Sequence, residues 1–298
     1  MFFLKRDKKI RVFVSIRPEE IGGGSNTFAY NLVSWINSNN DKYKIVNNIL
    51  RADKAIIISH VADLGSLKKA KGKGCFIVHR VDEFFEKNVL DYRKKKHSKI
   101  IEINKLADIT VYQSDFVYKS VSPHLSCQRY KVIINGANNN LFKPTATFGD
   151  YIGHVSWSPN QRKRFDLLYD LIVNYPQEKF LLIGNHNKTE YDFLSLPNVK
   201  LVGPVNREEL VKHFHMMKML YLPSENDPCP NTAVEAVLSG VPVCYNENGG
   251  TREIVRNCGL PLNEIDDLLH DLALYRRRCF DRDDLHFDQV ALKYMSLI

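Results

Sequence analysis

The sequence lacks the features that mark membrane-spanning and disulfide-stabilised proteins. No apolar run reaches the ~18 residues that a spanning helix needs. Residues 1–16 hold too short an apolar stretch and no small-residue cleavage site, so we do not expect a signal peptide. The six cysteines form no C-x-x-C pair and no Cys/His spacing of a zinc site, and are expected to be reduced. These absences predict a cytoplasmic protein.

What the chain has in excess is positive charge. Lysine and arginine number 42 against 34 acidic residues, a formal net charge of +8. This balance favours anionic partners such as nucleotides or an anionic membrane surface, so peripheral membrane contact is allowed but not required. No aromatic-interleaved recognition motif accompanies the basic runs, and nucleic-acid binding is not predicted. These runs are residues 4–9, 68–74, 92–99 and 160–164.

The chain of 298 residues is long enough for two domains. Short apolar runs typical of strands alternate along it with stretches of helical periodicity, which predicts βαβ units and parallel sheets. Residues 135–150 are rich in turn formers and lack periodicity, so they are the expected boundary. We therefore expect an α/β protein whose two similar halves face each other across a cleft.

A glycine run, Gly22 to Gly24, lies between a predicted strand and a predicted helix. This place is the carboxyl edge of a parallel sheet, where ligands bind in open α/β folds. Glycine lets backbone N–H groups approach an anion closely, and the helix dipole adds positive charge. The dinucleotide pattern G-x-G-x-x-G fails because Thr27 occupies the third glycine position. Either a phosphate or sugar contact or a tight turn fits the run.

The stretch SENDPCPNTAVEAVLSGVPV, residues 224–243, places two acids around the start of an apolar helix. Pro230 fits the first helical position, where its missing N–H costs nothing. Asp227 precedes the turn and Glu235 lies one turn inside the helix, so both can face one pocket. A carboxylate at Glu235 suits a ribose diol, and one at Asp227 suits sugar hydroxyls. The alternative is that the helix dipole alone favours these acids. The amides ready for a phosphate are those of Asn231, Thr232 and Ala233.

Several motifs in the same order resemble glycosyltransferase family 4, the retaining GT-B enzymes of glycosyl transferases group 1. Asp227 and Glu235 stand at the family's acid spacing, followed by EAVLSGVPV and GGTREIV. IGGGSNTF resembles the family's amino-terminal glycine loop, VIINGANNNLFKP its interdomain segment, and SWSPNQRKRFDLL its phosphate loop. The chain departs from the pattern in carrying Asp227 instead of Glu and Arg164 instead of Gly, and in being short.

This resemblance implies a GT-B fold of two Rossmann-like domains facing across a cleft. Residues 1–145 would bind the acceptor, residues 146–280 the nucleotide sugar, and the final helix, 281–298, would return to the first domain. The activity implied is transfer of a sugar, with retention, from a UDP- or GDP-linked donor to a glycan, lipid or small-molecule acceptor. Alternatives are a sugar-nucleotide epimerase or hydrolase and a catalytically silent binding protein.

The resemblance also assigns roles to single residues. Lys163, helped by Arg162, would neutralise the donor diphosphate, although a solvated basic turn is the alternative. Asp227 would contact the donor sugar, and Glu235 the ribose. His79 fits the sugar-contacting histidine that the family often has in this region, although Asp82 could occupy the matching position, and a structural role for His79 is a further alternative. No metal or cofactor is implied, and the D-x-D triplet in residues 281–284 is expected to start a helix. The remaining donor-binding residues would be Asn231, Thr232, Ala233, Gly23, Gly24, Gly249 and Gly250. His154 could also face the cleft, and Arg80 with Asp82 could form a local ion pair.

Overall fold

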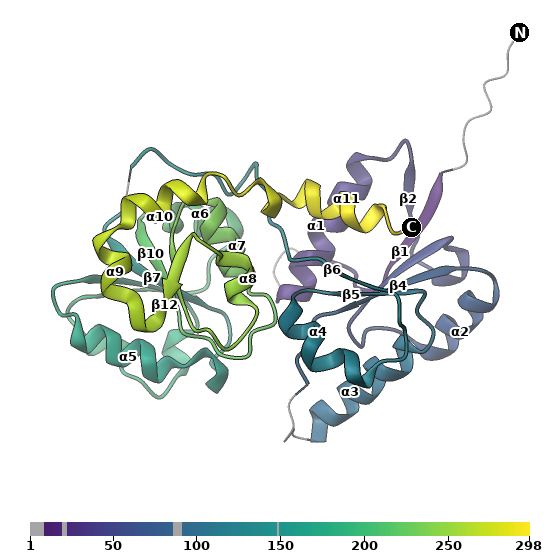
Figure 1. The fold of residues 1–298 in the computed structure, drawn as a ribbon, viewed down its shortest axis with the longest axis horizontal. Helices are drawn as coiled ribbons and strands as arrows, with labels where there is room; N and C mark the ends of the chain where they lie inside the picture. The colour runs from purple at the N-terminus through teal and green to yellow at the C-terminus, as the bar shows by residue number, and fades with distance from the viewer. Residues whose placement is uncertain (1–8, 20–22, 86–90, 148) are drawn as a thin grey trace, which may run out of the picture. The chain divides into compact units, whose positions relative to one another are not determined.

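The computed structural model describes residues 9–19, 23–85, 91–147 and 149–298 (Figure 1). The chain divides into two compact units, and each is described by itself. Unit 1 consists of residues 1–133 and 290–298, and unit 2 of residues 134–289. Within the described ranges, no helix is long and apolar enough to cross a membrane.

Unit 1 is built on a six-stranded parallel sheet with the strand order β2-β1-β3-β4-β5-β6. The central strands β3 and β4 are almost wholly buried, because helices cover both faces of the sheet (Figure 1). Its strands are β1 Ile10–Val14, β2 Tyr43–Ile45, β3 Lys54–Ile58, β4 Phe76–Val81, β5 Ile109–Tyr112 and β6 Tyr130–Val132. Its helices are α1 Gly24–Ser38, α2 Leu64–Gly72, α3 Asp91–Asn104 and α4 Asp115–Val121, joined by part of α11, Phe287–Met295.

Unit 2 repeats this plan with a second six-stranded parallel sheet, in the order β12-β11-β10-β7-β8-β9. The two together confirm the predicted α/β class with parallel sheets. Its strands are β7 Tyr151–Ser156, β8 Lys179–Gly184, β9 Val199–Val202, β10 Met217–Leu222, β11 Val243–Tyr245 and β12 Gly259–Pro261. Its helices are α5 Phe165–Asn174, α6 Arg207–Phe214, α7 Asn231–Leu238, α8 Thr251–Val255, α9 Ile265–His270 and α10 Leu272–Cys279.

Each sheet has one point where the strand order reverses. In unit 1 the chain builds β1 and β2 in one direction and then crosses to the other side of β1 to form β3. In unit 2 it runs from β7 through β8 to β9 and then returns to the free side of β7 to form β10. Loops leaving the two strands at such a point diverge, which opens a crevice at the carboxyl ends of the strands. The sheets therefore place one potential ligand site in each unit.

The segment predicted as the boundary is held by unit 2. Ala137 donates its N–H to the carbonyl of Leu285 at 3.1 Å and accepts from Phe287 at 2.9 Å. The buried guanidinium of Arg276 binds the carbonyls of Thr145 and Thr147. Because these contacts tie residues 134–147 to unit 2, the division falls at 133/134 rather than after residue 145.

The end of the chain belongs to unit 1. From Val290 onward, helix α11 is part of that unit, whereas residues 281–289 group with unit 2. The ring of Tyr294 packs on that of Phe28 from α1, with ring centroids 4.9 Å apart. Val290, Ala291 and Tyr294 are all buried. Residues 290–298 thus complete the part of the unit 1 core that includes Phe28 of α1.

Candidate functional site

The switch point of unit 2 brings together two of the predicted site residues. The ammonium of Lys163 lies 3.0 Å from a carboxylate oxygen of Asp227. Lys163 ends the short 3-10 helix η3 (Gln161–Lys163) that follows β7, and Asp227 lies in the loop that follows β10. The two side chains are only 24% and 18% exposed. A cation and an anion therefore meet at the place where this sheet is expected to bind a ligand.

The loop that carries Asp227 is shaped by the predicted glycine pair. Asp227 and Gly249 form an isolated parallel bridge, and the N–H of Gly250 binds the carbonyl of Asp227 at 2.9 Å. Gly249 has φ +155°, and a Cβ there would lie 2.9 Å from the carbonyl oxygen of Asp227. Only glycine allows this close approach of backbones. In this structure Gly249 and Gly250 position Asp227.

Arg164, where the family pattern has glycine, adopts the left-handed conformation with φ +50° and ψ +54°. Its guanidinium binds Asp166 at 2.7 Å and Glu225 at 3.1 Å, and hydrogen bonding to Asp166 raises its pKa. These ion pairs offset the conformational cost of a side chain in this region. The N–H of Glu225 also donates to the carbonyl of Arg162 at 2.9 Å. This hydrogen bond joins the η3 turn to the loop that follows β10.

Glu235 is buried on α7, with 7% of its surface exposed. Its carboxyl group makes no hydrogen bond with any residue that the structure describes. Burial raises its pKa to about 8, against a smaller opposing effect of Arg207. A buried acid without a hydrogen-bond partner is costly to keep and is more common in functional sites than elsewhere. Glu235 is thus the strongest single candidate for a ligand contact in unit 2.

The start of α7 is fixed by a residue that sequence reasoning missed. The amide of Asn135 donates to the side chain of Asn231 at 2.8 Å and to the carbonyl of Cys229 at 3.2 Å. Pro230 occupies the N-cap position and provides no side-chain cap. The predicted amide of Ala233 is already bonded to the carbonyl of Pro230 at 3.1 Å, whereas Thr232 shows no such bond in the described chain. In the sequence, only Pro230 and the asparagine of the interdomain motif, Asn135, indicate this arrangement.

In unit 1, the predicted glycine loop meets the strand-end motif around Asp82. Gly23 is the N-cap of α1, and a Cβ added there would meet nothing within 4 Å. Ser25, in the first turn of α1, donates to the carboxylate of Asp82, which also binds Arg80 at 2.9 Å. Although burial opposes it, these partners lower the pKa of Asp82. Gly24 opens the same turn, whereas Gly22 lies outside the described residues.

His79 does not reach a ligand-accessible surface. It is fully buried in β4, where its Nε2 lies 2.9 Å from the carbonyl of Ser59 and its Nδ1 3.3 Å from the amide nitrogen of Asn104. Burial lowers its pKa to about 4, so the ring is neutral at pH 7. Both ring nitrogens lie within hydrogen-bonding distance of protein atoms, so the structure gives His79 a structural role. The predicted ion pair of Arg80 and Asp82 is present.

Two other sequence candidates make contacts within the protein. His154 is fully buried and its Nδ1 lies 2.6 Å from Nε2 of His186, so it does not face a ligand site. Next to the D-x-D triplet, Asp284 binds Arg282 at 2.8 Å and Arg256 at 3.2 Å. Arg282 in turn is buried and donates to the carbonyl of Ile254. Among the residues that the structure describes, no group of three or more His, Cys, Asp or Glu could hold a metal ion.

Comparison with known proteins agrees with this geometry. Residues 150–273, most of unit 2, match the family described as glycosyl transferases group 1. No curated protein sequence matches the chain. The structure is similar to sucrose-phosphate synthase from Thermosynechococcus elongatus, with a TM-score of 0.76, 15% identity and coverage of 97% and 98% of the two chains. It is also similar to HepE from Anabaena in complex with UDP-glucose, with a TM-score of 0.72, 14% identity and coverage of 98% and 100%.

These similarities define the class in two steps. The match in fold over nearly the whole chain, together with the two parallel sheets, confirms the predicted GT-B fold. The family match covers residues 150–273 and agrees with the resemblance to glycosyl transferases group 1 that the motifs inside this range carry.

Proposed function

We propose that this protein is a retaining glycosyltransferase that moves a sugar from a nucleotide-diphosphate donor to an acceptor. The single observation that carries the proposal is the site in unit 2. A lysine and an aspartate meet at its switch point, and a buried acid without a hydrogen-bond partner lies on the helix that follows. This site lies inside the segment that matches glycosyl transferases group 1.

The chemistry needs positive charge where the diphosphate leaves. As the bond between the anomeric carbon and the diphosphate breaks, negative charge grows on the phosphate oxygens. Lys163 supplies a cation there, and the start of α7 adds the positive end of the helix dipole. Groups already oriented toward developing charge can lower the barrier by about 3 kcal/mol each. Arg162, one residue before Lys163 in the sequence, is proposed to add to this charge.

The donor nucleoside is expected to lie beside Glu235. Because its pKa is raised to about 8, the carboxyl group is largely protonated at neutral pH before a ligand binds. In that form it both donates and accepts a hydrogen bond, as a ribose diol requires. Two of the similar proteins were solved with UDP or a UDP-sugar, HepE with UDP-glucose and TarM of S. aureus with UDP, which supports UDP-sugars as the donors to test first.

The test is a donor screen by thermal shift and mass spectrometry with UDP-, GDP- and ADP-sugars, on wild type and Glu235→Ala. We expect one nucleotide class to stabilise wild type and not the variant, with slow hydrolysis of that donor in the absence of acceptor. Excess EDTA in parallel samples tests the prediction that no metal is needed. Binding without turnover, even with mixed acceptors, would favour a silent nucleotide-sugar-binding protein. Turnover to an altered sugar nucleotide would favour an epimerase.

A further inference from the structure

Two cysteines of unit 2 that are distant in sequence meet in its core. Cys258 directly precedes β12, and Cys279, 21 positions later, is the last residue of α10. The sulfur of Cys279 lies 4.0 Å from the carbonyl oxygen of Cys258, and its thiol donates to the sulfur of Cys258. Both are free thiols and are buried, with 0% and 2% of their surface exposed. Because their side chains already face each other, a disulfide can join them with little movement of the backbone.

A buried arginine holds positive charge against one of the two sulfurs. Nη1 of Arg282 lies 3.6 Å from the sulfur of Cys258 and donates to the carbonyl of Ile254 at 2.6 Å. Nε of the same guanidinium lies 2.8 Å from the carboxylate of Asp284. The hydrogen bond from Cys279, supported by Arg282, lowers the pKa of Cys258 to about 7, and the same hydrogen bond raises the pKa of Cys279. At neutral pH a thiolate and a thiol therefore lie next to each other.

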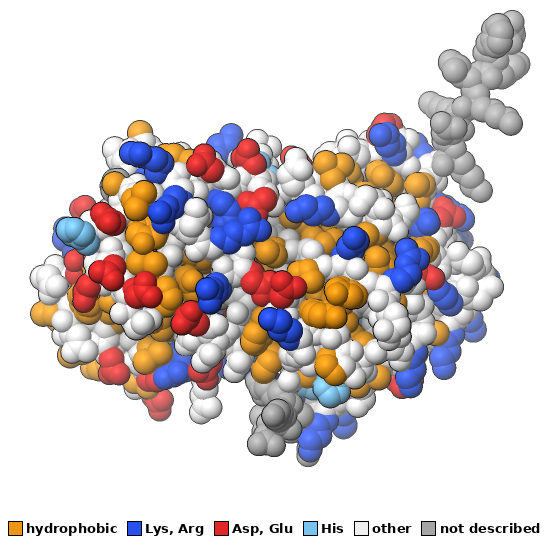
Figure 2. All heavy atoms as spheres, viewed as in Figure 1, with side chains coloured by type: hydrophobic (Ala, Val, Ile, Leu, Met, Phe, Trp, Pro, Cys, Tyr) orange, Lys and Arg blue, Asp and Glu red, His pale blue; other side chains and the backbone are white. Residues whose placement is uncertain are grey.

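The turn that precedes Cys258 is strained and exposed. Arg256 has φ +51° and ψ −117°, a conformation that is costly for a residue other than glycine, and both Arg256 and Asn257 are exposed. The guanidinium of Arg256 pairs with Asp284 at 3.2 Å. Basic and acidic side chains are interspersed over unit 2 (Figure 2), and such exposed ion pairs contribute little to stability. Local opening of this turn can therefore admit a molecule as small as a peroxide.

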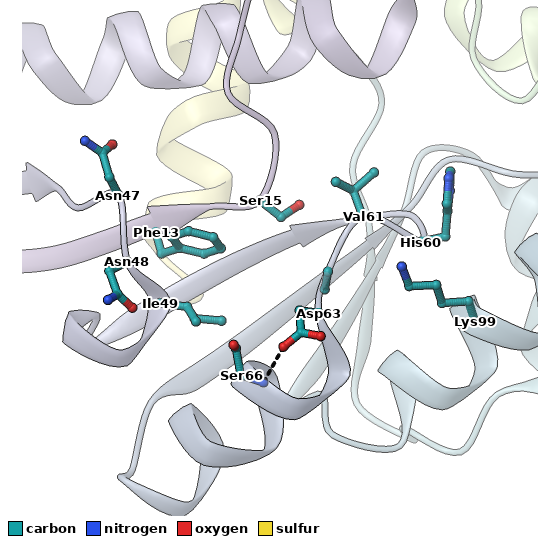
Figure 3. A pocket seen from close by; sticks show the side chains of 11 residues that line it. Phe13, Ser15, Asn47, Asn48, Ile49, His60, Val61, Asp63, Ser66 and Lys99 are labelled. Atoms are coloured by element: carbon teal, nitrogen blue, oxygen red, sulfur yellow. Dashed lines mark hydrogen bonds between the residues drawn. The ribbon is translucent and has the colours of Figure 1, made fainter.

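The cysteine pair is not part of the largest pocket of unit 1 or of the proposed donor contacts. That pocket, about 630 Å³ in volume, is lined by residues such as Ser15, Asn48 and His60 (Figure 3), and no cysteine is among the described residues that line it. In unit 2 the sulfurs contact α10 through the carbonyl of Tyr275 and the turn after it through Arg282. Oxidation of the pair is therefore expected to act on the packing of α8, α10 and β12.

We propose that Cys258 and Cys279 form a reversible redox modification site, which a peroxide oxidises to a disulfide and a dithiol reduces again. The disulfide joins the segment before β12 to the end of α10 and so constrains the unfolded chain of unit 2. It also fixes the chain that follows α8, whose N-cap residue Gly250 binds the carbonyl of Asp227 at 2.9 Å. Unit 2 is therefore more stable in the oxidised form. This modification is independent of the transfer reaction proposed above.

The reaction takes place in two steps that balance. The thiolate of Cys258 attacks one oxygen of the peroxide, so that an S–O bond forms, the O–O bond breaks, and the hydroxide that leaves takes up a proton to become water. The sulfur of Cys279 then attacks the sulfenic acid, the S–S bond forms, and the hydroxyl group leaves with the thiol proton as a second water. The two sulfurs together lose two electrons, and the two oxygens of the peroxide gain them.

The experiment treats the whole reduced protein with hydrogen peroxide and maps its cysteines by mass spectrometry. After catalase has removed the peroxide, the protein is unfolded in N-ethylmaleimide and digested without a reductant. We expect a cross-linked peptide that contains Cys258 and Cys279, lighter by two hydrogen atoms than its two parts and absent after treatment with dithiothreitol. Full alkylation of both cysteines would overturn the proposal. So would a sulfinic acid at Cys258 without a cross-link.

Thermal unfolding of three variants tests the effect on stability. Cys258→Ala and Cys279→Ala remove the pair, and Cys244→Ala is the matched control, since Cys244 is buried in β11 with its sulfur 3.6 Å from the carbonyl of Pro261. Peroxide should raise the thermal midpoint of wild type and Cys244→Ala by at least about 5 °C and leave the other two unchanged. An equal rise in Cys258→Ala, or no rise in cross-linked wild type, would contradict stabilisation by this disulfide. The mapping on wild type decides the cross-link even if a substitution impairs folding.

Discussion

The ammonium of Lys163 has an anionic neighbour even without a ligand, the carboxylate of Asp227 at 3.0 Å. This pair holds the lysine in the position from which it would meet a phosphate. The aspartate is shorter by one methylene than the glutamate of the family pattern, yet it still reaches the lysine. We therefore expect Asp227 to act in binding through the lysine that it orients.

Replacement of Lys163 by alanine should reduce turnover of the donor by at least about a hundredfold, because a cation at the leaving group is removed. The free energy of unfolding should change by only about 1 kcal/mol. Steady-state kinetics and urea unfolding measure the two effects. Lys179→Ala is the matched control, since Lys179 pairs with Asp150 at 3.8 Å on the surface. Equal activity of the two variants would contradict a role for Lys163.

The raised pKa of Glu235 makes stability depend on pH in a defined direction. The unfolded protein loses this proton near pH 4.5, whereas the folded protein keeps it to about pH 8. The folded state therefore binds more protons between these values, and this residue's contribution to stability falls as pH rises through the window. Replacement by glutamine, which has nearly the same shape, removes that dependence.

Glu235→Gln should accordingly gain stability relative to wild type between pH 5 and pH 8, by on the order of 2 kcal/mol. Urea unfolding of both proteins at the two pH values gives the difference. Saturating UDP-sugar should shrink it, because a ligand would supply the hydrogen bonds that the carboxyl group lacks. A difference independent of pH would mean that the acid is ionised in the folded protein.

At the scale of elements, the glycines of two similar sequence segments, 22–24 and 249–250, have different structural roles. Gly249 is required by the close approach of the Asp227 backbone, whereas Gly23 has open space around the position of a Cβ. The first is needed for the fold of a loop. The second is not required by packing against any residue that the structure describes.

Gly249→Ala should destabilise the protein by about 1–3 kcal/mol, since the new methyl group would displace the loop that carries Asp227. Gly23→Ala should leave the thermal midpoint unchanged. If the loop approaches a ligand closely, Gly23→Ala should raise the KM for donor or acceptor. An unchanged KM would mean that Gly23 is only the start of a helix.

The long elements could be predicted from sequence because their apolar residues follow the periods of buried strands and amphipathic helices. The helix α2 is hard to predict, since four lysines in and beside it obscure its two buried residues, Leu67 and Ala70. Strands of three residues, such as β2 and β12, are too short to show a period of their own. In the site, the motifs identified Lys163, Asp227 and Glu235, whose contacts the structure then supplied.

What could not be predicted depends on contacts between distant residues. The burial of His79 follows from Asn104, a residue of α3 whose amide also binds Thr110. The left-handed turn at Arg164 is held by Glu225, which lies in another loop. No local pattern in the sequence reports either partner. The roles of the predicted site residues remain predictions for the experiments above.

At the scale of the whole molecule, unit 1 depends on the last nine residues of the chain. Tyr294 and Val290 are each 1% exposed, and the ring of Tyr294 packs against that of Phe28. The sequence has two tryptophans, Trp35 in unit 1 and Trp157 in unit 2. Each unit can therefore be followed by its own fluorescence in a variant that lacks the other tryptophan.

Deletion of residues 290–298 should destabilise unit 1 by at least about 3 kcal/mol, the usual loss for a buried aromatic with its neighbours. In the Trp157→Phe background, the transition reported by Trp35 should move to lower urea. In the Trp35→Phe background, the transition reported by Trp157 should stay in place. Coincident shifts of both would show that the two units unfold as one.

This arrangement has a consequence for how the protein is made. A ribosome delivers residues 1–133 first, but the part of the core that Phe28 shares with Tyr294 stays open until residues 290–298 have been added. Unit 2 consists of the continuous residues 134–289, so all of it is synthesised before residue 290. The half of the molecule that is synthesised first is therefore expected to be the half that finishes folding last.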